Sequence, residues 1–231
     1  MQIPIIYEDK HIVIVNKPIN MPTQSDPSGD VDLFSALKKQ YSKNQYIGLH
    51  HRLDRPVGGC VLFTKTKEVN KSIAKQIQNH SIRKYYLCIV CGCPDESKGS
   101  IKQYLKKLNT KNKSTITTES DTQGKLAMLD YEVIETISTS SYGTLSLLKI
   151  HLKTGRHHQI RVQLSSVNLP ILGDNKYNSI LKTQNTICLF SHALSVYHPF
   201  KKDFISAKTI PDTLATPWNL FSDSLKKQID S

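Results

Sequence analysis

Several absences in this 231-residue sequence narrow its class. No run approaches the roughly 20 apolar residues that a membrane span needs. The start, MQIPIIYEDKHIV, has no cationic flank before a long apolar run, so we expect a cytoplasmic protein without a secretion signal. Acids are scarce, with 19 Asp and Glu against 31 Lys and Arg, and the net charge is +12. Such a charge favours a polyanionic partner, either nucleic acid or an anionic membrane surface.

The usual cofactor and metal motifs are also missing. Neither G-x-x-x-x-G-K-[ST] nor a helix-opening G-x-G-x-x-G occurs, which argues against nucleotide-triphosphate and dinucleotide chemistry. Five cysteines are an odd number that suits free thiols. The CIVCGC segment (88–93) suggests zinc, but no second Cys/His pair follows at finger-like spacing, so packed structural cysteines are favoured. Adjacent histidines at 50–51 and 157–158 point apart and rarely share one ion, so a metal site is disfavoured.

The chain contains apolar residues at the spacing of helices, about 3.6 residues, and at the alternating spacing of strands. Short strands are expected at Ile3–Tyr7 and Ile12–Asn16, and helices at 32–43, 68–79 and 157–168. Further strands are expected at CVLFTKT, RKYYLCIVCG, LAMLDYEVIETI and GTLSLLKIHLKT, with a strand pair at TICLF and HALSVYHP. Mixed elements without a strict βαβ repeat predict an α+β fold around a mixed, largely antiparallel β-sheet. With no internal repeat or long linker, the chain is predicted to be a single domain, 1–231.

The segment HRLDRPVGG (51–59) sets one carboxylate, Asp54, between Arg52 and Arg55. Guanidinium groups favour the ionised form of a nearby Asp, so Asp54 is suited to nucleophilic or proton-abstracting work. Pro56 restrains the backbone, and two glycines permit a tight turn or a close approach. The alternative is that Asp54 only forms a structural ion pair with an arginine at a turn. Taken alone, the segment favours this structural role over a catalytic one.

Three other groups of residues could bind or orient an anionic substrate. Arg161 lies in the otherwise apolar setting QIRVQL and needs an anion, for which Asp54 and a substrate phosphate are candidates. In Arg83-Lys84-Tyr85-Tyr86, basic residues adjoin two tyrosine rings. Either the rings are ordinary core or surface residues of the sheet, or one of them stacks on a base that has been flipped out of its helix. Six lysines lie between 98 and 113 with no acid among them, either as a solvated loop or as a phosphate-binding segment. These are Lys98, Lys102, Lys106, Lys107, Lys111 and Lys113.

Taken in order, HRLDRPVGG, IRKYYLCIVCG, TGRHHQIRVQL and ILGDNKY resemble the RluA-type family of RNA pseudouridine synthases. The resemblance extends from IIYEDKHIVIVNKP to FSHALSVYHP, about 190 residues. It implies the pseudouridine synthase catalytic fold, no cofactor or metal, and action on tRNA or rRNA as a monomer with no obligatory protein partner. It also implies that Asp54 is the catalytic residue, that Tyr86 stacks on the flipped uracil and that Arg161 pairs with Asp54. Arg52, Arg55, Lys106 and Lys107 are expected to bind RNA.

Two departures from the family pattern follow. Relatives commonly have Thr-Ser-Gly or Val-Ser-Gly where this chain has Val57-Gly58-Gly59, so a loop hydrogen bond could be lost. The resemblance begins at residue 3, so we expect no N-terminal S4 RNA-binding module.

The rival interpretation is a noncatalytic RNA-binding or ribosome-assembly protein on the same fold. The presence of Asp54, Tyr86 and Arg161 argues against it.

Overall fold

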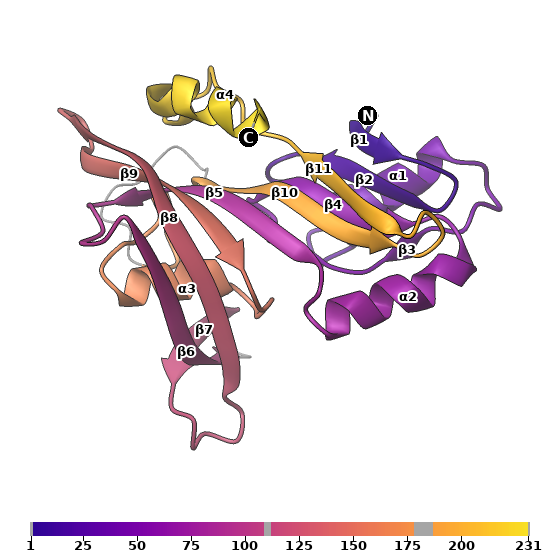
Figure 1. Ribbon diagram of the computed structural model, residues 1–231, viewed down its shortest axis with the longest axis horizontal. Helices are drawn as coiled ribbons and strands as arrows, with labels where there is room; N and C mark the ends of the chain where they lie inside the picture. The colour runs from indigo at the N-terminus through magenta and orange to yellow at the C-terminus, as the bar shows by residue number, and fades with distance from the viewer. Residues whose placement is uncertain (1, 109–111, 178–186, 231) are drawn as a thin grey trace. The chain divides into compact units, whose positions relative to one another are not determined.

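The computed structural model of the chain describes residues 2–108, 112–177 and 187–230. The chain divides into two compact units. Unit 1 comprises Met1–Lys84 and Phe190–Pro211, and unit 2 comprises Tyr85–Leu189 and Asp212–Ser231. Both contain strands and helices, in a mixed and mostly antiparallel arrangement that confirms the predicted α+β class (Figure 1). None of the described helices is both long enough and apolar enough to cross a membrane.

Unit 1 is a sheet covered by two helices. Its strands follow the order β1-β2-β4-β10-β11, and the two-residue β3 pairs with β4. Strands β4 and β10 run parallel, whereas the other neighbours run antiparallel. The elements are β1 (Ile5–Glu8), β2 (Ile12–Lys17), α1 (Leu33–Gln40), β3 (Gly48–Leu49), β4 (Gly58–Thr64), α2 (Lys67–Gln78), β10 (Leu189–His198) and β11 (Asp203–Lys208).

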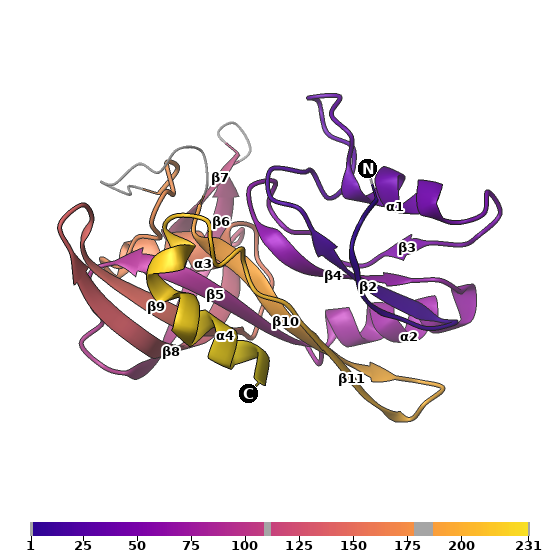
Figure 2. The ribbon, with the colours of Figure 1, turned by 90° about the horizontal axis from the view of Figure 1, so that it is seen from above.

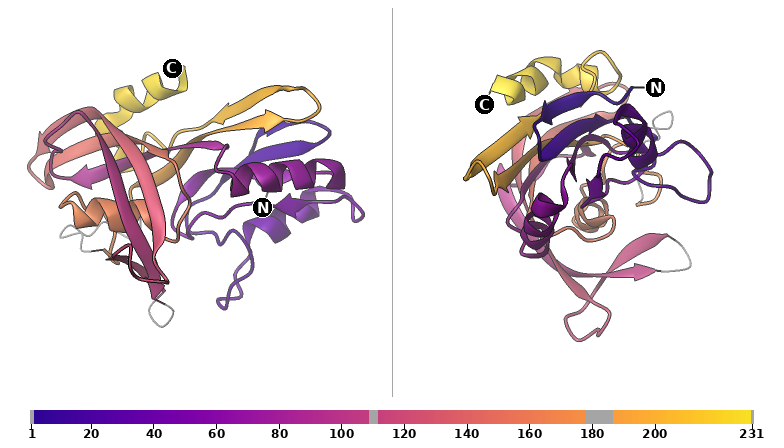
Figure 3. Two further views of the ribbon diagram at one scale, coloured as in Figure 1. Left: turned by 60° about the horizontal axis from the view of Figure 1, so that its bottom comes forward. Right: turned by 90° about the vertical axis from the view of Figure 1, so that its right-hand side faces the viewer.

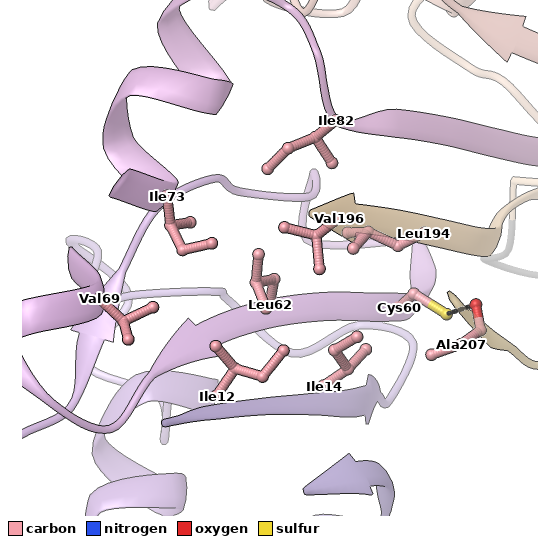
Figure 4. Packing of buried hydrophobic residues seen from close by; sticks show 10 residues of the cluster. All are labelled: Ile12, Ile14, Cys60, Leu62, Val69, Ile73, Ile82, Leu194, Val196 and Ala207. Carbon is pink, nitrogen blue, oxygen red and sulfur yellow. Dashed lines mark hydrogen bonds between the residues drawn. The ribbon is translucent and has the colours of Figure 1, made fainter. Parts of the chain in front are cut away.

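The core of unit 1 explains why consecutive residues of β2 and β4 are apolar, at Ile12–Val15 and Cys60–Phe63. Helix α2 presents Val69 and Ile73, one turn apart, to one face of these strands (Figure 4). On the opposite face, Phe34 of α1 stacks on Phe63 of β4. Since both faces are covered, strict apolar and polar alternation is absent. The cluster drawn in Figure 4 comprises Ile12, Ile14, Cys60, Leu62, Val69, Ile73, Ile82, Leu194, Val196 and Ala207.

Unit 2 is an antiparallel sheet with α3 packed on one part of it. Its strands follow the order β5-β9-β8-β6-β7 (Figures 2 and 3). Val162 of α3 packs with Leu105 of β6, Ala127 of β8 and Tyr177. The elements are β5 (Arg83–Cys91), β6 (Lys98–Leu108), β7 (Lys113–Thr117), β8 (Lys125–Thr139), β9 (Gly143–Leu152), α3 (Gln159–Ser166), the 3-10 helix η1 (Trp218–Phe221) and α4 (Ser222–Asp230).

Two sequence-based predictions of secondary structure were wrong. The expected strand pair TICLF and HALSVYHP is instead one strand, β10, paired with the unpredicted β11; Thr186 lies outside the described residues. The polar Ser191-His192 step does not end β10, because Ser191 Oγ donates to the Cys60 carbonyl and His192 Nδ1 lies 2.7 Å from the Thr209 carbonyl. Of the two interpretations of the lysine run, the solvated loop is wrong, since the described residues of the run lie mainly on β6 and the start of β7; phosphate binding stays a prediction.

Candidate functional site

The HRLD loop, residues 51–57, connects β3 to β4 and carries Asp54 on a turn. The Val57 amide donates to the Asp54 carbonyl at 3.0 Å, which closes the turn. Leu53 is buried, and Thr23 Oγ1 both accepts from its amide and donates to its carbonyl. Asp54 itself is half-buried. The carboxylate therefore sits on a backbone that is fixed on both sides.

His51 attaches the start of this loop to β4. Its Nε2 accepts the Leu62 amide at 3.0 Å, which requires an unprotonated nitrogen. Loss of surrounding water, and then the positive charge of Lys84, lower the pKa of His51 to about 3. The ring is therefore neutral at physiological pH and remains an acceptor. No catalytic or binding role was predicted for His51 from the sequence.

Lys17 lies beneath the HRLD loop and was missed from sequence. Its side chain is 1% exposed, and Nζ donates to the carbonyls of Pro18 at 2.9 Å, Met21 at 2.7 Å and Arg55 at 3.1 Å. Burial lowers the pKa of Lys17 to about 7, and the negative charge of Asp54 opposes that shift. The signal in the sequence was a lysine ending the apolar strand IVIVNK before a proline.

Arg55 has carboxylate partners that the sequence did not suggest. Its guanidinium donates to Ser28 Oγ at 2.9 Å, forms an ion pair with Asp30, and lies 3.8 Å from Asp26. Both acids belong to the exposed segment 26–30, so Arg55 connects that segment to the HRLD loop. The neighbouring Arg52 is exposed. Neither arginine is tested as an RNA ligand by these contacts, and that role stays a prediction.

The two glycines after Val57 begin β4 in tight surroundings. Gly59 has φ +111°, and a Cβ there would lie 2.1 Å from the Ser191 carbonyl oxygen, so only glycine fits. At Gly58, where the expected family pattern has serine, a Cβ would lie 3.0 Å from Ile19 Cγ2 and from Phe190 Cε2. These side chains fill the space next to Gly58. Packing therefore restrains the loop at the position where this chain lacks the serine hydroxyl.

Arg161 in unit 2 has the anion that its burial requires. It is 5% exposed, and its Nε and one terminal nitrogen each donate to a separate oxygen of Asp174 at 2.7 Å. Its guanidinium carbon lies 5.3 Å from the centre of the Tyr177 ring. The sequence reading did not consider Asp174 for this role, although it is the acid of ILGDNKY. The pairing of Arg161 with Asp54, which belongs to the other unit, stays a prediction.

Tyr86 lies on β5 opposite Ile150 of β9 and is 7% exposed, so most of its ring is packed in the sheet. Its neighbour Tyr85 stacks on His151, with ring centroids 4.7 Å apart. Arg83 places its guanidinium over Phe204, 5.4 Å from the ring centre. The stacking of Tyr86 on a base stays a prediction.

The adjacent histidines of the TGRHHQIR segment are held by hydrogen bonds. His157 Nδ1 lies 2.9 Å from Ser114 Oγ, and His158 Nδ1 lies 2.8 Å from the Tyr177 hydroxyl, which accepts the Ser114 amide. These contacts attach the start of β7 to the start of α3. Within the three described ranges, no cluster of His, Cys, Asp and Glu has an arrangement that could hold a metal ion. Of the cysteines in CIVCGC, Cys88 is buried and Cys93 is exposed.

Two lysines of the run form ion pairs with acidic residues. Lys106 lies 3.2 Å from Asp121, and Lys98 lies 2.9 Å from Glu132. These acids are distant in sequence and reach the run through the β6–β8 pairing and the turn after β7. Lys107 is exposed on the same strand. Lys111 lies outside the described residues.

Most of the chain is similar to known proteins of one family. The family model described as RNA pseudouridylate synthase matches residues 11–166. The "Ribosomal large subunit pseudouridine synthase C" of Buchnera aphidicola subsp. Baizongia pistaciae is 30% identical over 207 residues, covering 86% of this chain and 64% of that protein. The "tRNA pseudouridine synthase C" of Haemophilus ducreyi is 30% identical over 216 residues, covering 86% of this chain and 87% of that protein.

Solved structures show the same fold. "Human RNA Pseudouridylate Synthase Domain Containing 1" matches with a TM-score of 0.77 and 20% identity, covering 94% of this chain and 86% of the other. The chain spans less than two thirds of the length of several curated relatives, including 62% of the "Ribosomal large subunit pseudouridine synthase C" of Rickettsia bellii.

Proposed function

Because the chain belongs to the RNA pseudouridylate synthase family, we propose that it converts uridine in structured RNA to pseudouridine. In this isomerisation the C1′–N1 bond breaks, the uracil turns, and a C1′–C5 bond forms. The proton on C5 is lost to solvent and N1 gains one, so the atoms balance and no co-substrate is consumed. The target uridine must leave its stack first, because the sugar and the ring edge are inaccessible inside a helix.

The observation that carries the proposal is the fixed HRLD loop. Asp54 is half-buried on a turn closed by the Val57 amide and supported by Lys17 below. A carboxylate held in one position costs little further ordering when substrate binds. We assign Asp54 the catalytic role, either attacking the sugar or removing a ribose proton. Both routes use its ionised form.

The other assigned residues bind the substrate. Tyr86 stacks on the flipped uracil, and Arg161, whose orientation is fixed by Asp174, takes part in substrate binding. The arginines that flank Asp54 and the lysines 106 and 107 contact RNA phosphates. The net charge of +12 supports this, since each neutralised phosphate releases counterions.

Two sets of relatives support the proposed class of RNA. One is named for the large ribosomal subunit and one for tRNA. We propose that the substrate is one or both of these RNAs, modified in the cytoplasm by a monomer that needs no protein partner. The family model runs across both units, from residue 11 to residue 166, so we propose that they act as one catalytic domain. Mapping pseudouridines in total RNA with and without the gene would identify the target.

The activity is tested with RNA carrying tritium at uridine C5. We expect the wild-type protein to release tritium, and Asp54→Asn to release none while binding RNA with unchanged affinity. Asp95→Asn, an exposed Asp outside the loop, serves as the matched control and should release tritium normally. If wild type and Asp54→Asn both release nothing from total cellular RNA, the noncatalytic RNA-binding interpretation replaces this one.

A further inference from the structure

A groove of about 300 Å³ lies in unit 1, lined by residues of the C-terminal half of α2 and of the β10–β11 hairpin. It shares no residue with the HRLD loop. Its volume is at the lower end of the range for small-ligand sites. Its lining contains no acidic residue and comprises Ser72, Lys75, Gln76, Asn79, Ser81, Tyr197 and Phe204. We call it the α2 groove.

Two aromatic rings are exposed in the α2 groove. Tyr197 of β10 is 39% exposed and Phe204 of β11 is 50% exposed. They are direct partners in the antiparallel pair, and their ring centroids lie 5.6 Å apart in an edge-to-face arrangement. Exposed rings on a sheet surface are the kind of platform on which nucleic-acid bases stack, whatever the base sequence.

Gln76 of α2 holds this platform in place. Its amide oxygen accepts the Tyr197 amide at 3.1 Å, and its amide nitrogen donates to the Tyr197 carbonyl at 2.8 Å. Both backbone groups of Tyr197 thus point towards α2 and away from β11. Tyr197 and Phe204 therefore form the non-hydrogen-bonded type of pair, in which side chains approach closely. The backbone that carries the Tyr197 ring is therefore held before any ligand binds.

Cations surround the rings. The Arg83 guanidinium lies over Phe204, 5.4 Å from the ring centre, and is exposed. On α2, Lys67, Lys71 and Lys75 recur every four residues and are exposed, and the last of them lines the groove. At a rise of 1.5 Å per residue, successive lysines are about 6 Å apart along the helix axis. They form a line of positive charge that leads to the aromatic pair.

We propose that the α2 groove is an accessory site for single-stranded RNA. A base stacks on Phe204 and Tyr197, and the adjoining phosphates contact Lys75, Lys71 and Arg83. A peptide is disfavoured as the occupant, because Gln76 already satisfies the backbone groups of Tyr197 that an added strand would use. The site lies outside the residues assigned to catalysis and goes beyond the proposed function.

The test uses a fluorescein-labelled 12-nucleotide oligoadenosine RNA and measures its affinity by fluorescence anisotropy. This RNA holds no uridine, so its binding does not depend on turnover, and Asp54→Asn should bind it as wild type does. Phe204→Ala and Tyr197→Ala should each weaken binding by about 5- to 160-fold, which corresponds to the loss of one base–aromatic stack. Phe204→Trp should restore it.

The matched control for the rings is Phe200→Ala, since Phe200 is 57% exposed in the same unit but stacks on His11 outside the groove. The matched control for charge is Lys226→Gln on α4, compared with the double variant Lys71→Gln/Lys75→Gln. The double variant should reduce the slope of log affinity against log salt by about 1.4, at about 0.7 per lysine. Wild-type affinity in both ring variants, or an equal loss in Phe200→Ala, would overturn the proposal, as would capture of an acidic peptide without RNA binding.

Discussion

Lys17→Met tests whether the buried amine supports the HRLD loop. Methionine has a similar length and fills the same space, but it removes the donor to three backbone carbonyls. The bond to Met21 is fully buried, and those to Pro18 and Arg55 are partly buried. A buried acceptor left without its donor costs about 1–3 kcal/mol, and a partly buried one costs less because water can reach it. We expect a loss of about 3 kcal/mol in the free energy of unfolding at pH 7.

The pH dependence separates this role from simple packing. In the unfolded chain Lys17 has the ordinary lysine value near 10.5, whereas burial lowers its pKa in the folded protein to about 7. Between these values the unfolded state binds more protons, so the contribution of Lys17 to stability rises with pH, by up to about 1.4 kcal/mol per unit. The stability difference between wild type and Lys17→Met should therefore grow from pH 7 to pH 9.

Urea denaturation at several pH values measures both effects, with tritium release recorded on the same samples. Lys226→Met, at an exposed position on α4, is the control and should change stability by less than about 0.5 kcal/mol. If Lys17→Met matches that control at pH 7 and shows no added dependence on pH, the amine does not support the loop. A stable variant with reduced tritium release would assign Lys17 to positioning alone.

Three further results are expected. Asp174→Asn removes the carboxylate of a buried pair and leaves Arg161 uncompensated, so thermal unfolding should show a loss of about 3–5 kcal/mol; an unchanged midpoint would contradict this. Gly59→Ala should cost more than 3 kcal/mol in urea because backbone must move, whereas Gly143→Ala, with positive φ but open space, should cost about 1 kcal/mol; equal losses would refute the steric argument. Lys107→Gln should reduce the salt slope of RNA binding by about 0.7–0.9, and an unchanged slope would indicate a merely solvated lysine.

Predictions from sequence succeeded where local periodicity agreed with packing. Helix α2 follows from Val69 and Ile73 on one face, and β4 from its continuous apolar run between glycines and a polar turn. They failed where distant contacts decided the outcome. Ser191 and His192 looked like a break, but β4 and the segment after β11 satisfy their side chains and the strand continues.

In the candidate site too, residues with a local sequence signal could be predicted and residues that depend on distant contacts could not. Asp54 could be found because its segment has an unusual composition and a family resemblance. Asp174 and Lys17 could not be assigned roles, because their partners lie 13 or more residues away or are backbone carbonyls brought together only by folding. The lysine run looked free of acids for the same reason, since Glu132 reaches it through the β6–β8 pairing and Asp121 from the turn after β7.

The amide of Gln76 has a consequence for assembly. At Tyr197 it takes the place of a neighbouring strand, because it offers one donor and one acceptor at the spacing of a backbone ladder. A strand edge with unsatisfied groups is a template for pairing with another chain, and proteins commonly block such edges with charge, proline or bulges. Here one side chain occupies the strand edge at Tyr197, next to two exposed rings, so the backbone groups of that residue are not available to pair with another strand.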